Sequence, residues 1–251
     1  GNHWDCITTT EKLVEEILPQ LLSDSVVEDK VKLTTPEEDE INPVSICALK
    51  YKKKVLTALS ILLVKKEGNL FLTAYPFCEH TERIWLQVED VIKVPEQPEA
   101  IIKACDQEKR EMSYFDTKYY NTIYHLDGGG YIGVALTGFA YKAEIVENTE
   151  IKLEGQDAIK HQEMIKEEIE FDDEGNVKPI VFSTKELVAF LPDDNYPDDY
   201  EFQSPLFAID ELEFFGEELY KLKILILRDK DVYINLFVKK SHFNGKKLEI
   251  G

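Results

Sequence analysis

The chain has 251 residues, 43% of them hydrophobic, and a formal net charge of −20, which is the composition of an acidic globular protein. This charge repels a phosphate backbone and an anionic bilayer, so we expect neither nucleic acid nor a membrane as a partner. No apolar run approaches the roughly 20 residues that span a bilayer, and no amino-terminal leader pattern is visible.

The residues between 10 and 23 predict an amphipathic helix, because apolar side chains recur at every fourth position. Thr10 is its expected N-cap, and Pro19 should kink or end it. The acidic, proline-bounded stretch 34–43 reads as a linker. We therefore expect residues 1–43 to form an N-terminal helix and an acidic linker.

Short β-branched and aromatic runs predict a first β-barrel-like domain over residues 44–147. A hairpin turn is expected at 65–70. Two strands, 100–105 and 110–116, are expected around a turn that begins at Asp106. A long strand is predicted over 131–147, where internal glycines would let the sheet bend over on itself.

The next part of the chain, residues 148–200, predicts an acidic helical connector. A helix is expected over 155–171, followed by a turn at 172–176. Ser183 should cap a short helix. The stretch 192–205, with three prolines, reads as an extended linker.

Three strand patterns, at 206–216, 217–229 and 231–240, lie within residues 201–251 and predict a second β segment. This segment lacks a closing strand, so we expect it to be incomplete at its C-terminus. The predicted fold class is therefore β-rich α+β. It consists of two small antiparallel β-barrel segments, an N-terminal helix and the acidic helical connector.

Three stretches, "YFDTKYYNT", "LTGFAYKAEIV" and "YEFQSPLFAIDELEFFGEELYKLKI", resemble an uncharacterised family of bacterial proteins. The resemblance covers residues 100–251. It implies small OB-like β-barrels with appended helices, and a chain that continues past Gly251 into another strand. It implies no activity, so it assigns no catalytic residue.

The aromatic stretch 114–133 contains the candidate ligand-binding residues. Its "DGGG", at 127–130, lacks the Gly-Lys-Ser/Thr of a phosphate-binding loop and predicts a tight turn. The aromatic rings either pack the core and rim or form a stacking surface for a neutral ligand or a peptide. The carboxylate among them is expected to fix a turn. The candidates are Tyr114, Asp116, Tyr119, Tyr120 and Tyr124.

No metal site or cofactor is expected. Cys78 and His80 could supply two ligands, but zinc sites need four at characteristic spacings. The acidic turns at 171–176 and 193–199 do not match the calcium-binding loop pattern. The cysteines are far apart and contain no CxxC motif, which favours free thiols in a reducing, cytoplasmic compartment. They are Cys6, Cys47, Cys78 and Cys105.

The acidic charge is concentrated in residues 147–218, where 22 aspartates and glutamates face five lysines. Such a surface either keeps the protein soluble or attracts a basic protein surface or cations. We expect a non-enzymatic, cytoplasmic bacterial protein that acts as a protein-binding or scaffold module. The oligomeric state does not follow from the sequence.

Two other functions stay open. One is an immunity- or inhibitor-type protein that masks a basic surface on a toxin or an enzyme. The other is a hydrolase with a site near Asp116 and Tyr120. No catalytic residue is assigned, because none of the common hydrolase, metalloprotease or kinase motifs occurs in the chain.

Overall fold

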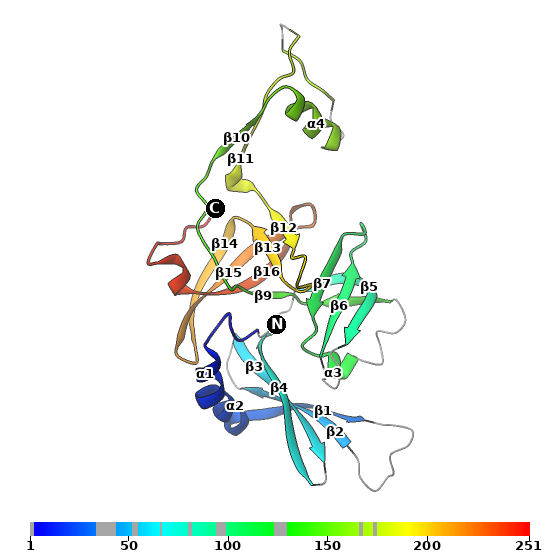
Figure 1. Ribbon diagram of the computed structural model, residues 1–251, viewed down its shortest axis with the longest axis vertical. Helices are drawn as coiled ribbons and strands as arrows, with labels where there is room; N and C mark the ends of the chain where they lie inside the picture. Colours follow the sequence, from blue (N-terminus) through cyan, green and yellow to red (C-terminus); the bar gives the residue numbers. More distant parts are fainter. Residues whose placement is uncertain are drawn as a thin grey trace.

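The structure is a computed structural model that describes residues 3–33, 44–51, 55–65, 67–79, 82–93, 99–122, 130–165, 168–172 and 175–251. The described residues form a β-rich α+β fold of several mainly antiparallel sheets with short helices (Figure 1). None of these sheets closes into a barrel in the described part of the chain. The α+β class is thus confirmed, whereas the predicted barrels are not.

The N-terminal helix lies where the sequence predicts it, as α1 (Thr10–Lys12), the π-helical η1 (Leu13–Ile17) and α2 (Leu18–Asp24). The cap is Thr9 and not Thr10, since the Lys12 N–H donates to Thr9 Oγ1 at 3.3 Å. The π-helical turn shifts the hydrogen-bond register and places Pro19 in the first turn of α2. A missing N–H is tolerated there, so the proline does not end the helix.

The first sheet has the order β1-β2-β3-β4 and is antiparallel throughout. Its strands are β1 (Ser25–Leu33), β2 (Val44–Tyr51), β3 (Leu56–Lys65) and β4 (Gly68–Cys78). The predicted hairpin is confirmed, because Lys65 pairs with Gly68, whose φ of +136° suits glycine. The sequence did not predict β1. The linker 34–43 lies outside the described residues.

Both faces of the first sheet are packed. On one face, Leu56 and Ala58 of β3 pack in a cluster with three residues of the N-terminal segment and helix. These are Trp4, Ile17 and Leu21. A separate cluster includes other buried residues of the same sheet and one tyrosine from α3 (Tyr119–Thr122). The sheet is therefore held between the N-terminal helix and the region around α3 (Figure 1).

The second sheet has the order β7-β6-β5-β8. Its strands are β5 (Ile84–Lys93), β6 (Ala100–Cys105), β7 (Glu111–Phe115) and β8 (Tyr131–Val134). The two strands predicted around the turn at Asp106 are confirmed as β6 and β7. The "DGGG" turn falls mostly on 123–129, outside the described residues.

The long strand predicted over 131–147 is wrong. β8 ends at Val134, and β9 (Thr137–Phe139) belongs to another sheet, where it pairs in parallel with β16 (Val232–Lys239). The chain thus crosses between two sheets within residues 135–136. A Cβ on Gly138 would lie 2.9 Å from Leu236 Cδ1, so a larger residue here would require the end of the Leu236 side chain to shift.

The third sheet has the order β14-β15-β16-β9, and its first two strands, β14 (Leu206–Phe214) and β15 (Glu217–Leu227), form a hairpin. The three strands predicted after residue 205 are therefore confirmed. Ile224, Leu236 and Val238 lie in its core. Two short turns of 3-10 helix, η3 (Arg228–Lys230) and η4 (Lys240–Phe243), flank β16.

The described part of the region predicted as a helical connector contains two two-stranded sheets and one α-helix. β10 (Glu150–Leu153) and β11 (Ile180–Ser183) pair, and with α4 (Gln156–Ile165) they form an arm that projects from the sheets (Figure 1). The helix expected over 155–171 is confirmed only over Gln156–Ile165, as α4, and residues 168–171 are not helical. Ser183 caps η2 (Thr184–Glu186), a single 3-10 turn. The turn at 172–176 is present, closed by the Asp172 N–H on the Asn176 carbonyl.

The extended linker predicted at 192–205 is wrong. β12 (Ala189–Pro192) and β13 (Tyr200–Gln203) pair as an antiparallel hairpin. Its turn forms because Asp193 Oδ1 accepts the N–H groups of Asn195 and Tyr196 at 2.7 and 3.1 Å. An aspartate can close a turn in this way even in a stretch rich in proline. The domain boundaries drawn from the sequence stay predictions.

A cluster of charges joins the β6–β7 turn to η3. Arg110 reaches Asp106 at 2.7 Å and Asp229 at 2.6 Å, and Lys230 Nζ lies 3.3 Å from Asp106 Oδ2. Burial by itself would raise the pKa of Asp106. Hydrogen bonds from the main chain and side chain of Arg110 lower that pKa to about 2. The second and third sheets are therefore tied by an ionised, buried carboxylate.

We predict that Gly138→Ala lowers the free energy of unfolding by about 1–2 kcal/mol, because Leu236 is buried and has little room to move. Gly130→Ala is the matched control, since nothing lies within 4 Å of an added Cβ there. Thermal melts of both variants beside the wild type measure the difference. Equal melting temperatures for the two variants would contradict the close approach at β9.

We also predict that Asp106→Asn costs about 2 kcal/mol of stability at neutral pH. The pKa of Asp106 is about 2 in the fold and about 3.9 when unfolded, so this stabilisation is present above pH 4. It is lost as the pH falls through 2. Denaturant unfolding at several pH values should show the variant and the wild type converging. Glu108→Gln, at an exposed member of the cluster, should have a smaller effect.

Candidate functional site

The two central tyrosines of the predicted site serve packing. Tyr119 and Tyr120 are each only 2% exposed, and they point into different cores. Tyr119 packs with the second sheet, and Tyr120 packs with the first. Burial raises the pKa of Tyr120, so its phenol stays protonated at neutral pH. Helix α3 thus joins two sheets through these rings.

Asp116 has the turn-forming role that the sequence predicts. Its Oδ1 accepts the Lys118 N–H at 2.9 Å, and its carbonyl accepts the Tyr119 N–H at 3.2 Å. Its own N–H donates to the Ala100 carbonyl at 3.0 Å. The residue therefore ends β7 and starts α3.

Tyr114, the first of the predicted residues, is partly buried, and burial raises its pKa. Its hydroxyl is buried without a hydrogen-bond partner among the described residues. Tyr124 lies outside the described residues. The structure therefore does not bring the predicted residues together around one cavity, and their assignment to a ligand stays a prediction.

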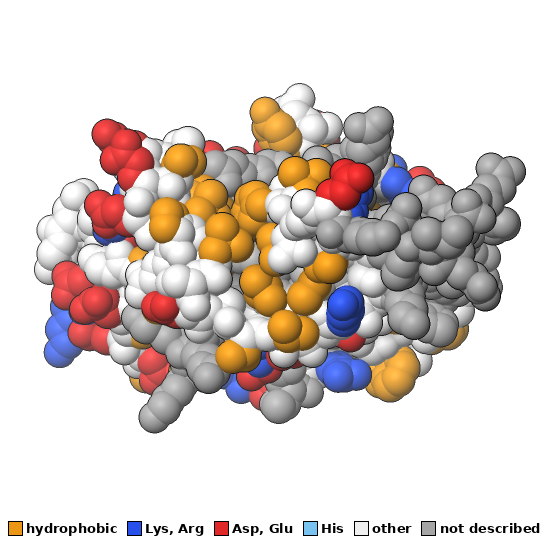
Figure 2. All heavy atoms as spheres, turned by 90° about the horizontal axis from the view of Figure 1, so that it is seen from below, with side chains coloured by type: hydrophobic (Ala, Val, Ile, Leu, Met, Phe, Trp, Pro, Cys, Tyr) orange, Lys and Arg blue, Asp and Glu red, His pale blue; other side chains and the backbone are white. Residues whose placement is uncertain are grey.

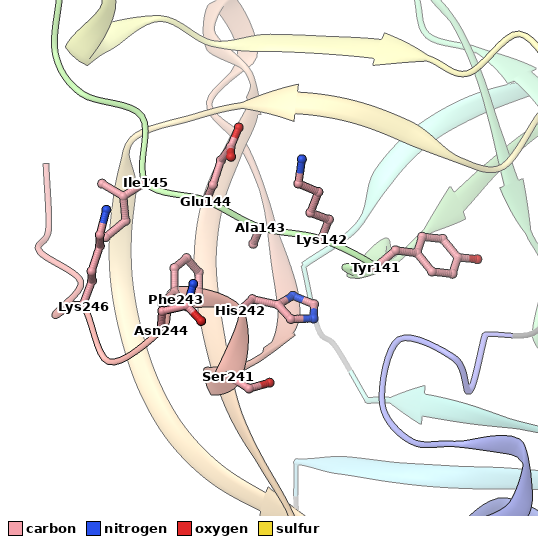
Figure 3. A pocket seen from close by; sticks show the side chains of 10 residues that line it. All are labelled: Tyr141, Lys142, Ala143, Glu144, Ile145, Ser241, His242, Phe243, Asn244 and Lys246. Carbon is pink, nitrogen blue, oxygen red and sulfur yellow. The ribbon is translucent and has the colours of Figure 1, made fainter.

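An open groove of about 430 Å³ lies elsewhere, on the third sheet's side of the molecule. The chain that leaves β9 forms one wall, and η4 with the turn after it forms the other (Figure 3). His242 lies in this groove, and burial lowers its pKa, with a contribution from the charge of Lys239. The lining residues are 141–145, 241–244 and Lys246. The sequence did not point to the groove, because 141–147 had been predicted as a paired strand.

The strongest electrostatic feature is the turn between β12 and β13. Residues 186–220 contain 11 aspartates and glutamates and no lysine or arginine. Further along this stretch, Asp210, Glu211 and Glu217 each pair with a lysine from elsewhere in the fold. The turn itself differs. None of its four aspartates lies within ion-pair distance of a described lysine or arginine. The four are Asp193, Asp194, Asp198 and Asp199.

Asp193 and Asp198 lie close enough to Asp199 to act on its carboxylate. The pKa of Asp199 is raised by burial and further by the negative charge of Asp198. Tyr196, at the tip of the same turn, is 59% exposed. The turn therefore carries one exposed and three half-buried carboxylates beside an exposed aromatic ring, and both features suit contact with a cationic surface.

Apolar side chains gather at the lower end of the molecule, on the face shown in Figure 2. The first sheet and the N-terminal helix lie at this end (Figure 1). Their exposed large apolar residues are Val14, Leu22, Val26, Val27, Val55 and Leu70. Neither the open groove nor the pocket between the N-terminal helix and β14 is lined by these residues, and we assign them no ligand.

All four cysteines are free thiols in the structure. Burial raises the pKa of Cys6 to about 12, so this thiol is a poor nucleophile. Among the described residues, no group of three or more His, Cys, Asp or Glu side chains is placed to hold a metal. His80 lies outside them. No described helix has the length and apolar character needed to cross a bilayer.

We predict that two tyrosine-to-phenylalanine changes near the predicted site affect the stability of the fold differently. Tyr114→Phe removes a buried hydroxyl without a described partner, so stability should be unchanged or slightly higher. Tyr200→Phe removes a hydroxyl that donates to the Ser113 carbonyl and accepts the Ser113 N–H, which should cost about 1–3 kcal/mol. Denaturant unfolding measures both. A large loss of stability in Tyr114→Phe would show that its hydroxyl has a structural partner.

Comparisons with protein-family models, with curated proteins and with solved structures find no significant match for this chain. The bacterial family that residues 100–251 resemble therefore stays a prediction.

Proposed function

We propose that this protein is a non-enzymatic binding module that contacts a basic surface of a partner protein through the turn of the β12–β13 hairpin. The observation that carries the proposal is the four-aspartate turn, whose charges are not neutralised by described lysines or arginines. The nearby Asp210, Glu211 and Glu217 are each paired with a lysine of the fold, whereas the charge of the turn has no such described partner. A basic partner would neutralise it and would be attracted by the net charge of −20.

The hairpin is also suited to binding by its structure. Its turn is held by the Asp193 hydrogen bonds to Asn195 and Tyr196, so the carboxylates are presented in a fixed arrangement. A pre-organised surface loses less conformational entropy when it binds. The cytoplasmic, reducing location proposed from the sequence fits the four free thiols.

An immunity- or inhibitor-type protein uses the same chemistry, since it masks a basic surface of a toxin or an enzyme. The two functions differ only in whether the partner loses its activity on binding. The hydrolase near Asp116 and Tyr120 has less support. Asp116 is occupied with turn hydrogen bonds, and Tyr120 is buried with a raised pKa.

The charge of the turn can be removed without losing its hydrogen-bond acceptors. We predict that a variant with all four turn aspartates changed to asparagine binds a partner captured from bacterial lysate at least about tenfold more weakly. Wild-type binding should weaken as salt rises from about 50 to 300 mM. Biolayer interferometry with the identified partner measures both effects.

The matched control removes four exposed acidic charges from other places in the acidic region. It combines Asp157→Asn, Glu163→Gln, Glu168→Gln and Glu213→Gln, all away from the β12–β13 turn. If the turn is the contact, this control keeps most of the affinity. Equal losses in the two variants would show that only the overall charge matters and would contradict a specific role for the hairpin.

A further inference from the structure

The chain segment after β9, residues 141–148, is called here the edge segment. Its main chain makes no backbone–backbone hydrogen bond to any described residue. The last such bond before it joins the Ala140 N–H to the Phe237 carbonyl at 2.9 Å, and the next main-chain acceptor is Thr149. Within the segment, the Glu147 carbonyl accepts a weak bond from Thr149 Oγ1 at 3.4 Å. Nearly all of its backbone groups therefore depend on solvent.

The edge segment nevertheless has the form of a β-strand. Lys142 and Glu144 point to one side of the chain and Ala143 points to the other, as in an extended backbone (Figure 3). Ala143 packs against the core of the third sheet, which anchors the segment at its start. The other residues of the segment are exposed, including Ile145 and Val146 at 42% and 56%. The sequence pattern likewise predicts a strand here.

The open groove lies directly beside this segment, between it and η4. Its volume of about 430 Å³ is within the range of about 300–1,000 Å³ that is usual for ligand sites. The groove provides space at the point where the backbone lacks a neighbour. Further along the chain, β10 continues from the segment and pairs with β11 on one side only.

We propose that the edge segment is an acceptor for an extended, basic stretch of a partner protein, which adds to it as a β-strand within the groove. An unpaired extended segment presents N–H donors and C=O acceptors in alternation, and the backbone of another extended segment pairs with them best. Glu144, Glu147 and Glu150 lie along the segment and at the start of β10, so basic side chains on the incoming strand complement it.

This inference rests on the proposed function in one respect, namely that the partner is a protein. It involves residues different from those of the β12–β13 turn, so the two proposals can fail separately. The turn acts through side-chain charge. The edge segment acts through main-chain hydrogen bonds.

The first test uses two synthetic peptides as probes, acetylated and amidated, one of alternating Lys and Val and the other of alternating Glu and Val. We expect the Lys-Val peptide to slow amide hydrogen exchange within 141–148, while the Glu-Val peptide does not. A Lys-Val peptide with every second amide N-methylated should bind at least about tenfold more weakly, because it cannot donate along one edge. Absence of protection in 141–148 at millimolar peptide would overturn the proposal.

The second test compares proline at two neighbouring positions, Ile145→Pro and Val146→Pro, in the 251-residue chain. Successive N–H groups of a strand point to opposite sides, so only one of these prolines removes a donor that faces the incoming strand. We expect that variant alone to bind the Lys-Val peptide at least about tenfold more weakly. Equal effects, or no effect, would contradict strand addition.

Alanine variants at the same two positions control for loss of the side chains, and thermal melts control for folding. The turn variant with four asparagines separates the two proposals. Loss of peptide binding in that variant, with no effect of either proline or of N-methylation, would show binding by charge at the turn and would overturn strand addition. Sensitivity to proline and N-methylation in the presence of those asparagines would support it.

Discussion

The parallel pairing of β9 with β16 is the contact on which the rest of the arrangement depends. It brings residues 137–139 against 235–237, about a hundred positions later in the chain. Gly138 leaves room at this contact for the end of the Leu236 side chain. The chain leaves the second sheet after β8 and completes the third sheet with β9. The three residues of β9 therefore connect the two sheets. The ion-pair cluster around Asp106 reinforces the same junction from the β6–β7 turn.

This junction also explains why the two proposed contact surfaces are exposed. Once β9 has paired with β16, the chain continues past the end of that strand and has no further neighbour, which leaves the edge segment open. The chain then forms the arm of β10, β11 and α4 and returns through the β12–β13 hairpin (Figure 1). Neither the β10–β11 pair nor the β12–β13 hairpin is joined to a larger sheet among the described residues. Two-stranded units of this kind gain little stability alone and are common where proteins meet partners.

Open edges carry a risk of uncontrolled association between copies of a chain. Net negative charge is a general remedy, because it keeps copies of the protein apart. The acidic region 147–218 includes β10, β11 and the β12–β13 hairpin, and so places this charge on the most open part of the fold. The same charge would select basic partners. Protection from self-association and selection of a partner are thus consistent with a single feature of the composition.

The sequence by itself determined the local elements whose signals lie within a few residues. The helix near Leu13, the hairpin at Gly68, the turn at Asp106 and the three strands after residue 205 were all predicted from spacing and turn chemistry. Asp116 was also placed correctly as a turn residue. Only the tertiary structure decided which strands are neighbours. The pattern over 131–147 indicates an extended chain, but periodicity reports which side chains are buried and not what covers the backbone. The break after β8, the distant partner of β9 and the unpaired edge segment follow from contacts between residues far apart in sequence, which no local pattern encodes.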